Sequence, residues 1–199
     1  MAAETKSPAT ADTPTLEELI ARPVVVTTLP KRGMVLKLDV KPDLLEALQE
    51  RFELNALSDL EAEAHLAPWK RGGVRVEGFV RAALVQPCAV SGEPLNTTIN
   101  EAMELTLLPA GSPLAVPDIG DTGELILDPD GADLPEIFEG DSIDIGGYWL
   151  EHFALGFDPY ARIEGASFQD VARDLPLDST GKESPFAALA ALKGDAEGR

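Results

Sequence analysis

The feature that most constrains the fold is a long stretch of alternating apolar and polar residues, VRVEGFVRAALVQPC, at positions 74–88. Alternation with a period of two is typical of a strand with one buried face. Ser91 and Gly92 then supply turn residues, and a second strand candidate follows over residues 96–107. The sequence therefore predicts a long antiparallel hairpin over residues 74–107.

Shorter strand and helix patterns surround this hairpin. Residues 23–40 combine a β-branched run with an alternating run and predict a second hairpin, while residues 57–66 predict a half-buried strand. An apolar stripe predicts a helix over residues 43–53, and residues 140–162 are typical of a strand that runs into a helix. We also expect a short strand at 124–128. The predicted fold class is α+β, a mainly antiparallel sheet with a few short helices on one face or edge; whether the sheet closes into a barrel stays open.

Length and composition predict one domain with loose ends. Residues 1–15 are rich in Ala, Thr, Pro and Ser without an apolar period, so we expect a disordered tail there. Residues 16–168 form the expected α+β domain, and residues 169–199 the expected polar tether. Within the tether, residues 184–193 predict a short helix, because Ser184 suits the N-cap position and a proline follows it.

Composition also indicates a cytoplasmic protein. The first residues lack the apolar run of a signal peptide and are too acidic for a transit peptide. The longest apolar runs fall far short of the roughly 20 residues that cross a bilayer, so we expect no membrane segment. A single cysteine cannot form an internal disulfide, which agrees with a reducing compartment.

The charge balance restricts the partners of the chain. It carries 35 acidic against 16 basic residues, a net charge of −19, and residues 82–161 hold fifteen acids and no Lys or Arg. Such a surface repels the phosphate backbone of nucleic acids, which are bound through Lys and Arg. The same field attracts basic proteins. We therefore expect a basic protein partner, while the alternative that the acidity only serves solubility stays open.

No pattern of catalytic or metal-binding residues stands out. With one cysteine and two histidines, a single chain cannot supply the four Cys or His ligands of a structural zinc site. It lacks the GxSxG, GxxxxGK[ST] and GxGxxG motifs of hydrolases and nucleotide-binding proteins. His65 is expected on the exposed side of its strand, and His152 follows Glu151 on a helix where adjacent side chains point in different directions. We therefore expect no enzyme, no cofactor and no metal.

Three blocks of sequence carry a resemblance to a known family. They read VRVEGFVRAALVQPCAVSGEPL, DLPEIFEGDSIDIGGYWLEHFALGFDPYAR and SPFAALAALK. In their order and spacing they resemble the YceD family, also described as large-ribosomal-RNA-subunit accumulation proteins. The resemblance covers roughly residues 20–168 and the terminal helix, and none of its elements is a catalytic signature.

This resemblance bears on the single cysteine. Many family members have a Cys-x-x-Cys in the hairpin turn, and some have a further cysteine cluster after the segment that matches residues 157–168. Here the second position is Ser91 and the later cluster is absent, while Ala161 replaces a proline found in relatives of this type. Cys88 is therefore interpreted as a small apolar residue, buried or half-buried, at the entry to the turn.

The resemblance implies a role in accumulation of large-subunit (23S) ribosomal RNA, in families often encoded next to a small ribosomal protein of that subunit. Joined to the charge argument, it predicts a non-enzymatic acidic factor that binds a basic ribosomal or assembly protein during ribosome biogenesis and contacts RNA only indirectly. The candidate contact residues lie in the base-free block and in its resembling segment: Asp133, Glu136, Asp141, Asp144 and Glu151.

Two other classes of function stay open. An acidic mimic of nucleic acid would occupy the groove of a DNA- or RNA-binding protein outside the ribosome. A metal-independent hydrolase would have to use residues such as Glu151 or His152 within the stretch 149–160. For any one of the acidic candidates, a solvated surface residue is the competing interpretation.

Overall fold

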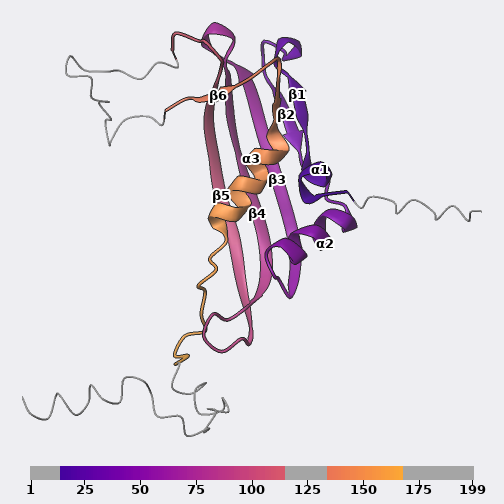
Figure 1. The fold of residues 1–199 in the computed structure, drawn as a ribbon, viewed down its shortest axis with the longest axis vertical. Helices are drawn as coiled ribbons and strands as arrows, with labels where there is room; N and C mark the ends of the chain where they lie inside the picture. Colours follow the sequence, from indigo (N-terminus) through magenta and orange to yellow (C-terminus); the bar gives the residue numbers. More distant parts are fainter. Residues whose placement is uncertain (1–13, 115–133, 168–199) are drawn as a thin grey trace, which may run out of the picture.

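The computed structural model describes residues 14–114 and 134–167, and their fold belongs to the α+β class, as predicted (Figure 1). The strands are β1 (Pro23–Val25), β2 (Met34–Lys37), β3 (Ala56–Pro68), β4 (Val74–Pro87), β5 (Pro94–Pro109), β6 (Glu136–Phe138) and β7 (Ser142–Asp144). The helices are α1 (Leu16–Ile20), α2 (Pro42–Arg51) and α3 (Ile145–Gly156), and two single 3-10 turns are η1 (Val26–Thr28) and η2 (Lys70–Gly72).

The strands form an open sheet of five, in the order β2-β3-β4-β5-β6, and a separate pair, β1-β7. All neighbours in the larger sheet are antiparallel except β5 and β6, which run parallel. In the described part of the chain the sheet does not close into a barrel. Helix α3 lies across β4 and β5, and α2 packs against β3 (Figure 1).

The predicted hairpin over residues 74–107 is confirmed as β4 and β5, which pair from Val74 opposite Leu107 to Pro87 opposite Pro94. The buried face follows the expected alternation, since Val74, Val76 and Val80 are at most 1% exposed. Gly78 lies on the same face, and a Cβ atom there would overlap with the carbonyl oxygen of Glu63 on β3. The close approach of the two backbones at this point therefore requires glycine.

The predicted half-buried strand over residues 57–66 is also confirmed, within β3. Its pairing with β4 shifts between Ser58 and Glu61, where Asp59 has a φ of 51°. A bulge adds one residue to a strand, which changes the parity of the residues that face the core. Leu57 and Ala62 are consequently both buried although an odd number of positions separates them.

The predicted hairpin over residues 23–40 is wrong. β1 pairs with β7, 117 or more residues away, with Val24 opposite Ile143, while β2 pairs with β3. The chain leaves the strand conformation at Val26, which begins η1 and donates its N–H to the carbonyl of Asp141 at 2.8 Å. Both halves were correctly identified as strand-forming, but their partners lie elsewhere because Val24 and Ile143 bury each other in the core.

Helices α2 and α3 begin close to their predicted positions, whereas α1 was not predicted. The N-cap of α1 is Thr15, a residue that the sequence placed in the tail; its hydroxyl accepts from the N–H of Glu18 and its own N–H donates to the Glu18 carboxylate. α2 matches the helix predicted over residues 43–53. α3 begins at Ile145, before the two glycines rather than after them, because Asp144 caps it.

One continuous core lies between the helices and the sheet. Trp149 and Phe153 of α3 are at most 2% exposed and pack over the sheet with Met103 of β5. The ring of Phe52, just after α2, lies 4.9 Å from that of Phe153 and 5.4 Å from that of Phe157, centroid to centroid. These contacts fix α2 and α3 relative to each other.

Some predictions lie outside the described residues. They are the tail over residues 1–13, the strand at 124–128, the contact residue Asp133, and the tether after residue 168 with its helix at 184–193. No helix in residues 14–114 and 134–167 has the length and apolar character needed to cross a bilayer.

Candidate functional site

The acidic candidates that the structure describes lie on β6, β7, α3 and the turn between the two strands. Glu136 opens β6, Asp141 lies in the turn before β7, Asp144 ends β7 and Glu151 lies on α3. All four are exposed. Glu139, in the same turn as Asp141, is a further exposed carboxylate that the sequence reasoning did not single out, although it belongs to the same base-free block. We call the exposed carboxylates of Glu136, Glu139, Asp141 and Glu151 the acidic surface.

Two of these candidates are brought together by a tyrosine. Burial, followed by a hydrogen bond to the carboxylate of Glu136 and the negative charges of Glu136 and Glu151, raises the pKa of Tyr148 above its ordinary value. The Tyr148 hydroxyl therefore keeps its proton and donates a hydrogen bond to the Glu136 carboxylate. Residues 136 and 151 are 15 positions apart in sequence, yet both act on the side chain of Tyr148.

Asp144 has a different role from the one predicted for it. One of its carboxylate oxygens accepts two backbone N–H groups, from Arg22 at 2.6 Å and from Gly146 at 3.0 Å. The second bond caps α3, and the first ties the start of β1 to the start of that helix. The backbone N–H of Ile145 donates to the carbonyl of Arg22 at the same junction. Asp144 is therefore a structural residue of the junction between α1, β1 and α3.

Apolar side chains lie among the acidic residues. Ile137, next to Glu136 on β6, is 58% exposed, and Leu155, one turn after Glu151 on α3, is 69% exposed. Leu134, just before β6, is 58% exposed. Surfaces that combine exposed apolar residues with charges of one sign are typical of protein contacts, although single exposed apolar residues are common.

Within residues 14–114 and 134–167, neither histidine forms a hydrogen bond or ion pair with a carboxylate. His65 is exposed on β3, as predicted. His152 is half-buried on α3, and its Nδ1 lies 2.9 Å from the carbonyl oxygen of Tyr148, one turn earlier. This contact requires the tautomer in which Nδ1 carries the proton. The hydrogen bond of the ring is therefore made to the backbone of α3 and not to the Glu151 carboxylate.

Cys88 is buried, 3% exposed, as expected for the entry to the hairpin turn. Its sulfur is also a hydrogen-bond acceptor, for the N–H of Ser91 at 3.5 Å and the N–H of Ile163 at 3.3 Å. The side-chain and backbone hydrogen bonds from Ser91, followed by the one from Ile163, lower the pKa of the Cys88 thiol to about 6. The turn thus binds the segment after α3 through sulfur, a contact that the sequence pattern did not reveal. Within residues 14–114 and 134–167, no three His, Cys, Asp or Glu side chains are grouped so as to hold a metal ion.

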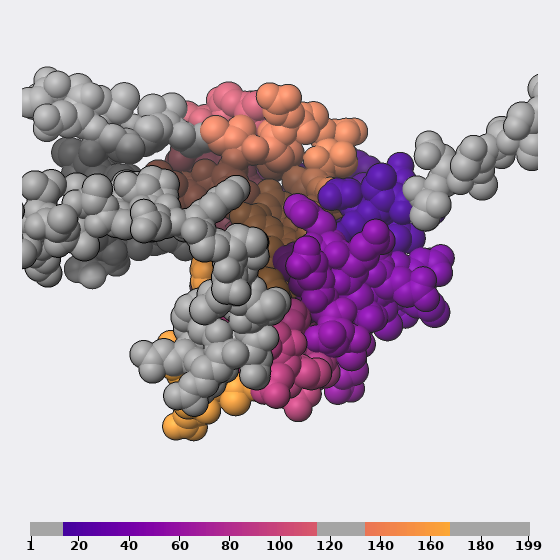
Figure 2. Space-filling view, turned by 60° about the horizontal axis from the view of Figure 1, so that its bottom comes forward, coloured from indigo at the N-terminus to yellow at the C-terminus, as the bar shows by residue number. Residues whose placement is uncertain are grey.

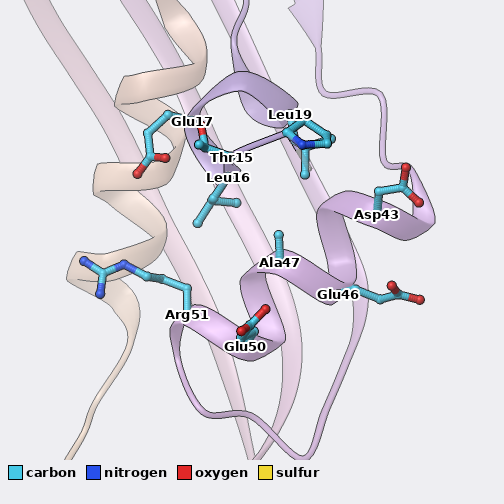
Figure 3. A pocket seen from close by; sticks show the side chains of 10 residues that line it. Thr15, Leu16, Glu17, Leu19, Asp43, Glu46, Ala47, Glu50 and Arg51 are labelled. Carbon is cyan, nitrogen blue, oxygen red and sulfur yellow. The ribbon is translucent and has the colours of Figure 1, made fainter. Parts of the chain in front are cut away.

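A second group of acidic residues lines a groove between α1 and α2, shown in Figure 3. The groove has a volume of about 480 Å³. Glu17 of α1 and Asp43, Glu46 and Glu50 of α2 carry its negative charge, and Arg51 lies at one end. The sequence analysis missed it, although acids at positions 43, 46 and 50 recur at the spacing of one helix face.

No family model, no curated protein and no solved structure matches this chain. The assignment to the YceD family therefore stays a prediction that depends on the three sequence blocks.

Proposed function

We propose that this chain is a non-enzymatic acidic factor of the YceD type, which supports accumulation of large-subunit (23S) ribosomal RNA by binding a basic ribosomal or assembly protein. The observation that carries the proposal is the acidic surface on β6, α3 and the turn between β6 and β7. It is built wholly from a stretch of 80 residues, 82–161, that contains no Lys or Arg. Ribosomal proteins are basic because they neutralise RNA phosphates, so a surface of this charge is complementary to them.

The details of the surface favour binding over catalysis. Tyr148 holds Glu136 by a hydrogen bond, so this carboxylate is anchored beside an aromatic ring, and the charge of Glu151 also acts on the same tyrosine. Exposed Ile137 and Leu155 add apolar contact area beside them. An anchored carboxylate loses less side-chain entropy on forming an ion pair than a free one does.

The magnitudes suit a transient complex. An exposed ion pair contributes roughly 0.2–1 kcal/mol, so the acidic surface supplies binding energy through several pairs acting together. Long-range attraction mainly raises the association rate and is screened within about 10 Å at 0.1 M salt. A complex formed this way assembles quickly and is released when the basic protein meets RNA, which carries a higher density of negative charge.

The experiment has two arms in the bacterium that makes the protein. Depletion should lower the ratio of large- to small-subunit ribosomal RNA and the large-subunit peak in sucrose gradients. A pull-down at low salt should recover a basic ribosomal or assembly protein with the wild-type chain and much less with the triple variant E136Q/D141N/E151Q. An unchanged RNA ratio and gradient profile would exclude the ribosomal role.

The acidic mimic of nucleic acid predicts a different result in the same pull-down. It would recover a DNA- or RNA-binding protein outside the ribosome, and added polynucleotide would displace that protein from the chain. Release of a ribosomal protein by 23S RNA alone, with an altered RNA ratio on depletion, would distinguish the assembly factor from the mimic.

A further inference from the structure

The groove between α1 and α2 has the charge and the shape of a docking site. Its volume of about 480 Å³ lies within the range of roughly 300–1,000 Å³ typical of binding pockets. Leu19 and Ala47 are half-buried and line its floor, while Glu17, Glu46 and Glu50 border it (Figure 3). Such a combination of apolar floor and charged rim is typical of protein interfaces.

The acids of the groove are available to a partner. Among the described residues, the ion pairs join Lys37 to Glu63, Lys41 to Asp39 and Arg75 to Glu77. None of them uses the four groove acids, and among the described residues that line the groove Arg51 is the only base. Four carboxylates against one guanidinium leave an excess of negative charge that an incoming cation would neutralise.

A helical segment fits this geometry best. α2 contains ten residues and is therefore about 15 Å long. Asp43, Glu46 and Glu50 recur along it at i, i+3 and i+7, so a helix laid beside α2 would meet them with Lys or Arg at the same spacing. About three turns of the partner would be engaged.

A second pocket, with aromatic and proline walls, adjoins one end of the groove. It has a volume of about 410 Å³ and shares Arg51 with the groove. The half-buried rings of Phe52 and Phe157 line it with two prolines, and the polar side chains of Glu53 and Gln86 complete its wall. Figure 2 shows the surface of α2 beside the tip of the β4–β5 hairpin, where this pocket lies. The pocket can hold one apolar side chain of the same partner, as buried anchor residues do at interfaces.

Charge complementarity points to another protein as the occupant. A second copy of this chain carries a net charge of −19 and would be repelled. The segments of the chain outside the described residues are also acidic overall. Residues 1–13 have two acids and one base, 115–133 six acids and no base, and 168–199 six acids and four bases.

We propose that the groove between α1 and α2 docks a basic helical segment of another protein, with Lys or Arg at i, i+3 or i+4 and i+7 and one apolar residue for the adjoining pocket. The proposal rests on the proposed function only for the sign of the partner's charge. It adds a site on α1 and α2, apart from the acidic surface on β6 and α3.

The test uses a synthetic amphipathic peptide of about four helical turns, labelled with fluorescein, with Lys at the stated spacing and one Leu as the anchor. Binding to the full-length chain is measured by fluorescence anisotropy at about 0.15 M salt. Three triple variants remove the same number of charges. They are D43N/E46Q/E50Q in the groove, E136Q/D141N/E151Q on the acidic surface, and E61Q/E104Q/E164Q as the control.

The groove variant should weaken peptide binding about tenfold, since three exposed ion pairs are lost, and the control variant less than about twofold. Ala47→Phe tests the shape without changing charge, because a larger side chain on the floor should weaken binding similarly. Replacing the Leu of the peptide by Gln should weaken it again. Circular dichroism of each variant confirms that it remains folded.

Several outcomes would overturn the proposal. Equal loss in the groove and control variants would show that only total charge matters. Loss confined to E136Q/D141N/E151Q would exclude the groove and leave the proposed function standing. Failure of the peptide to bind the wild-type chain would also exclude the groove. An unchanged ribosomal RNA ratio on depletion, with peptide binding lost in the groove variant, would exclude the proposed function and leave the groove.

Discussion

Substitution of Asp144 tests most directly whether a carboxylate stabilises the fold or is free to bind a partner. Asp144→Ala removes an acceptor for two backbone N–H groups, of Arg22 at 2.6 Å and of Gly146 at 3.0 Å. Loss of a helix N-cap costs about 1 kcal/mol, with a range of roughly 0.5–2. The N–H of Arg22 also donates to this charged acceptor, and such bonds contribute about 1.5–3 kcal/mol. We therefore expect the free energy of unfolding to fall by about 2–4 kcal/mol.

The assay is urea unfolding followed by circular dichroism, with Asp141→Ala as the matched control. Asp141 is an exposed carboxylate three residues earlier, and its backbone carbonyl, which accepts from Val26, survives the substitution. We expect this control to change stability by less than about 0.5 kcal/mol. Asp144→Asn retains an oxygen acceptor and should lie between the two. Equal stabilities of Asp144→Ala and Asp141→Ala would refute the assignment of Asp144 to the fold.

Three further predictions concern α3 and the hairpin turn. Gly146→Ala should destabilise the chain by about 1–3 kcal/mol, because the new Cβ atom would overlap with the carbonyl of Ile20. Gly147→Ala should stabilise the chain by up to about 1 kcal/mol, because the space around Gly147 is open. Thermal unfolding of the two variants tests this difference. The folded pKa of Cys88, about 6, is below its ordinary value of 9.0, so its contribution to stability should be complete above pH 9 and be lost as pH falls through 6. Urea midpoints across this range should show that loss in the wild type and not in Cys88→Ala. Because the pKa of Tyr148 is raised, its effect on stability has the opposite pH dependence, and the stability of the wild type should fall as pH rises above about 10. Tyr148→Phe should show a smaller fall in the same assay at alkaline pH.

The sequence predicted the elements whose signal is local. The β4–β5 hairpin follows from alternation on both sides of Ser91 and Gly92, and α2 from its apolar stripe. A local pattern says which face of an element is buried, and this held for Val76 and Val80. The prediction of β3 also holds despite the bulge at Asp59, because the bulge shifts the alternation by one residue without ending the strand.

Local sequence patterns did not predict which strands pair with each other. β1 has three residues, too few to carry a register of its own, and its pairing with β7 is decided by which core positions Val24 and Ile143 fill together. The start of α3 was misplaced for a related reason. Glycine has a poor helix propensity, so the pair at 146 and 147 suggested a break, but Gly146 lies inside the helix because α1 approaches it too closely for a side chain.

Acidic composition alone is also a local signal, and it does not identify which carboxylates bind a partner. A count of acids treats Glu18, Asp144 and Glu136 alike, yet the first caps α1, the second caps α3, and only the third lies free of a backbone role beside Tyr148. A stretch of sequence without bases therefore locates a surface but cannot choose its contact residues. The acids of α2 show the converse, since they lie outside that stretch and yet border a groove with an apolar floor. Geometry, more than charge density, separates carboxylates that hold the fold from those that a basic partner can reach.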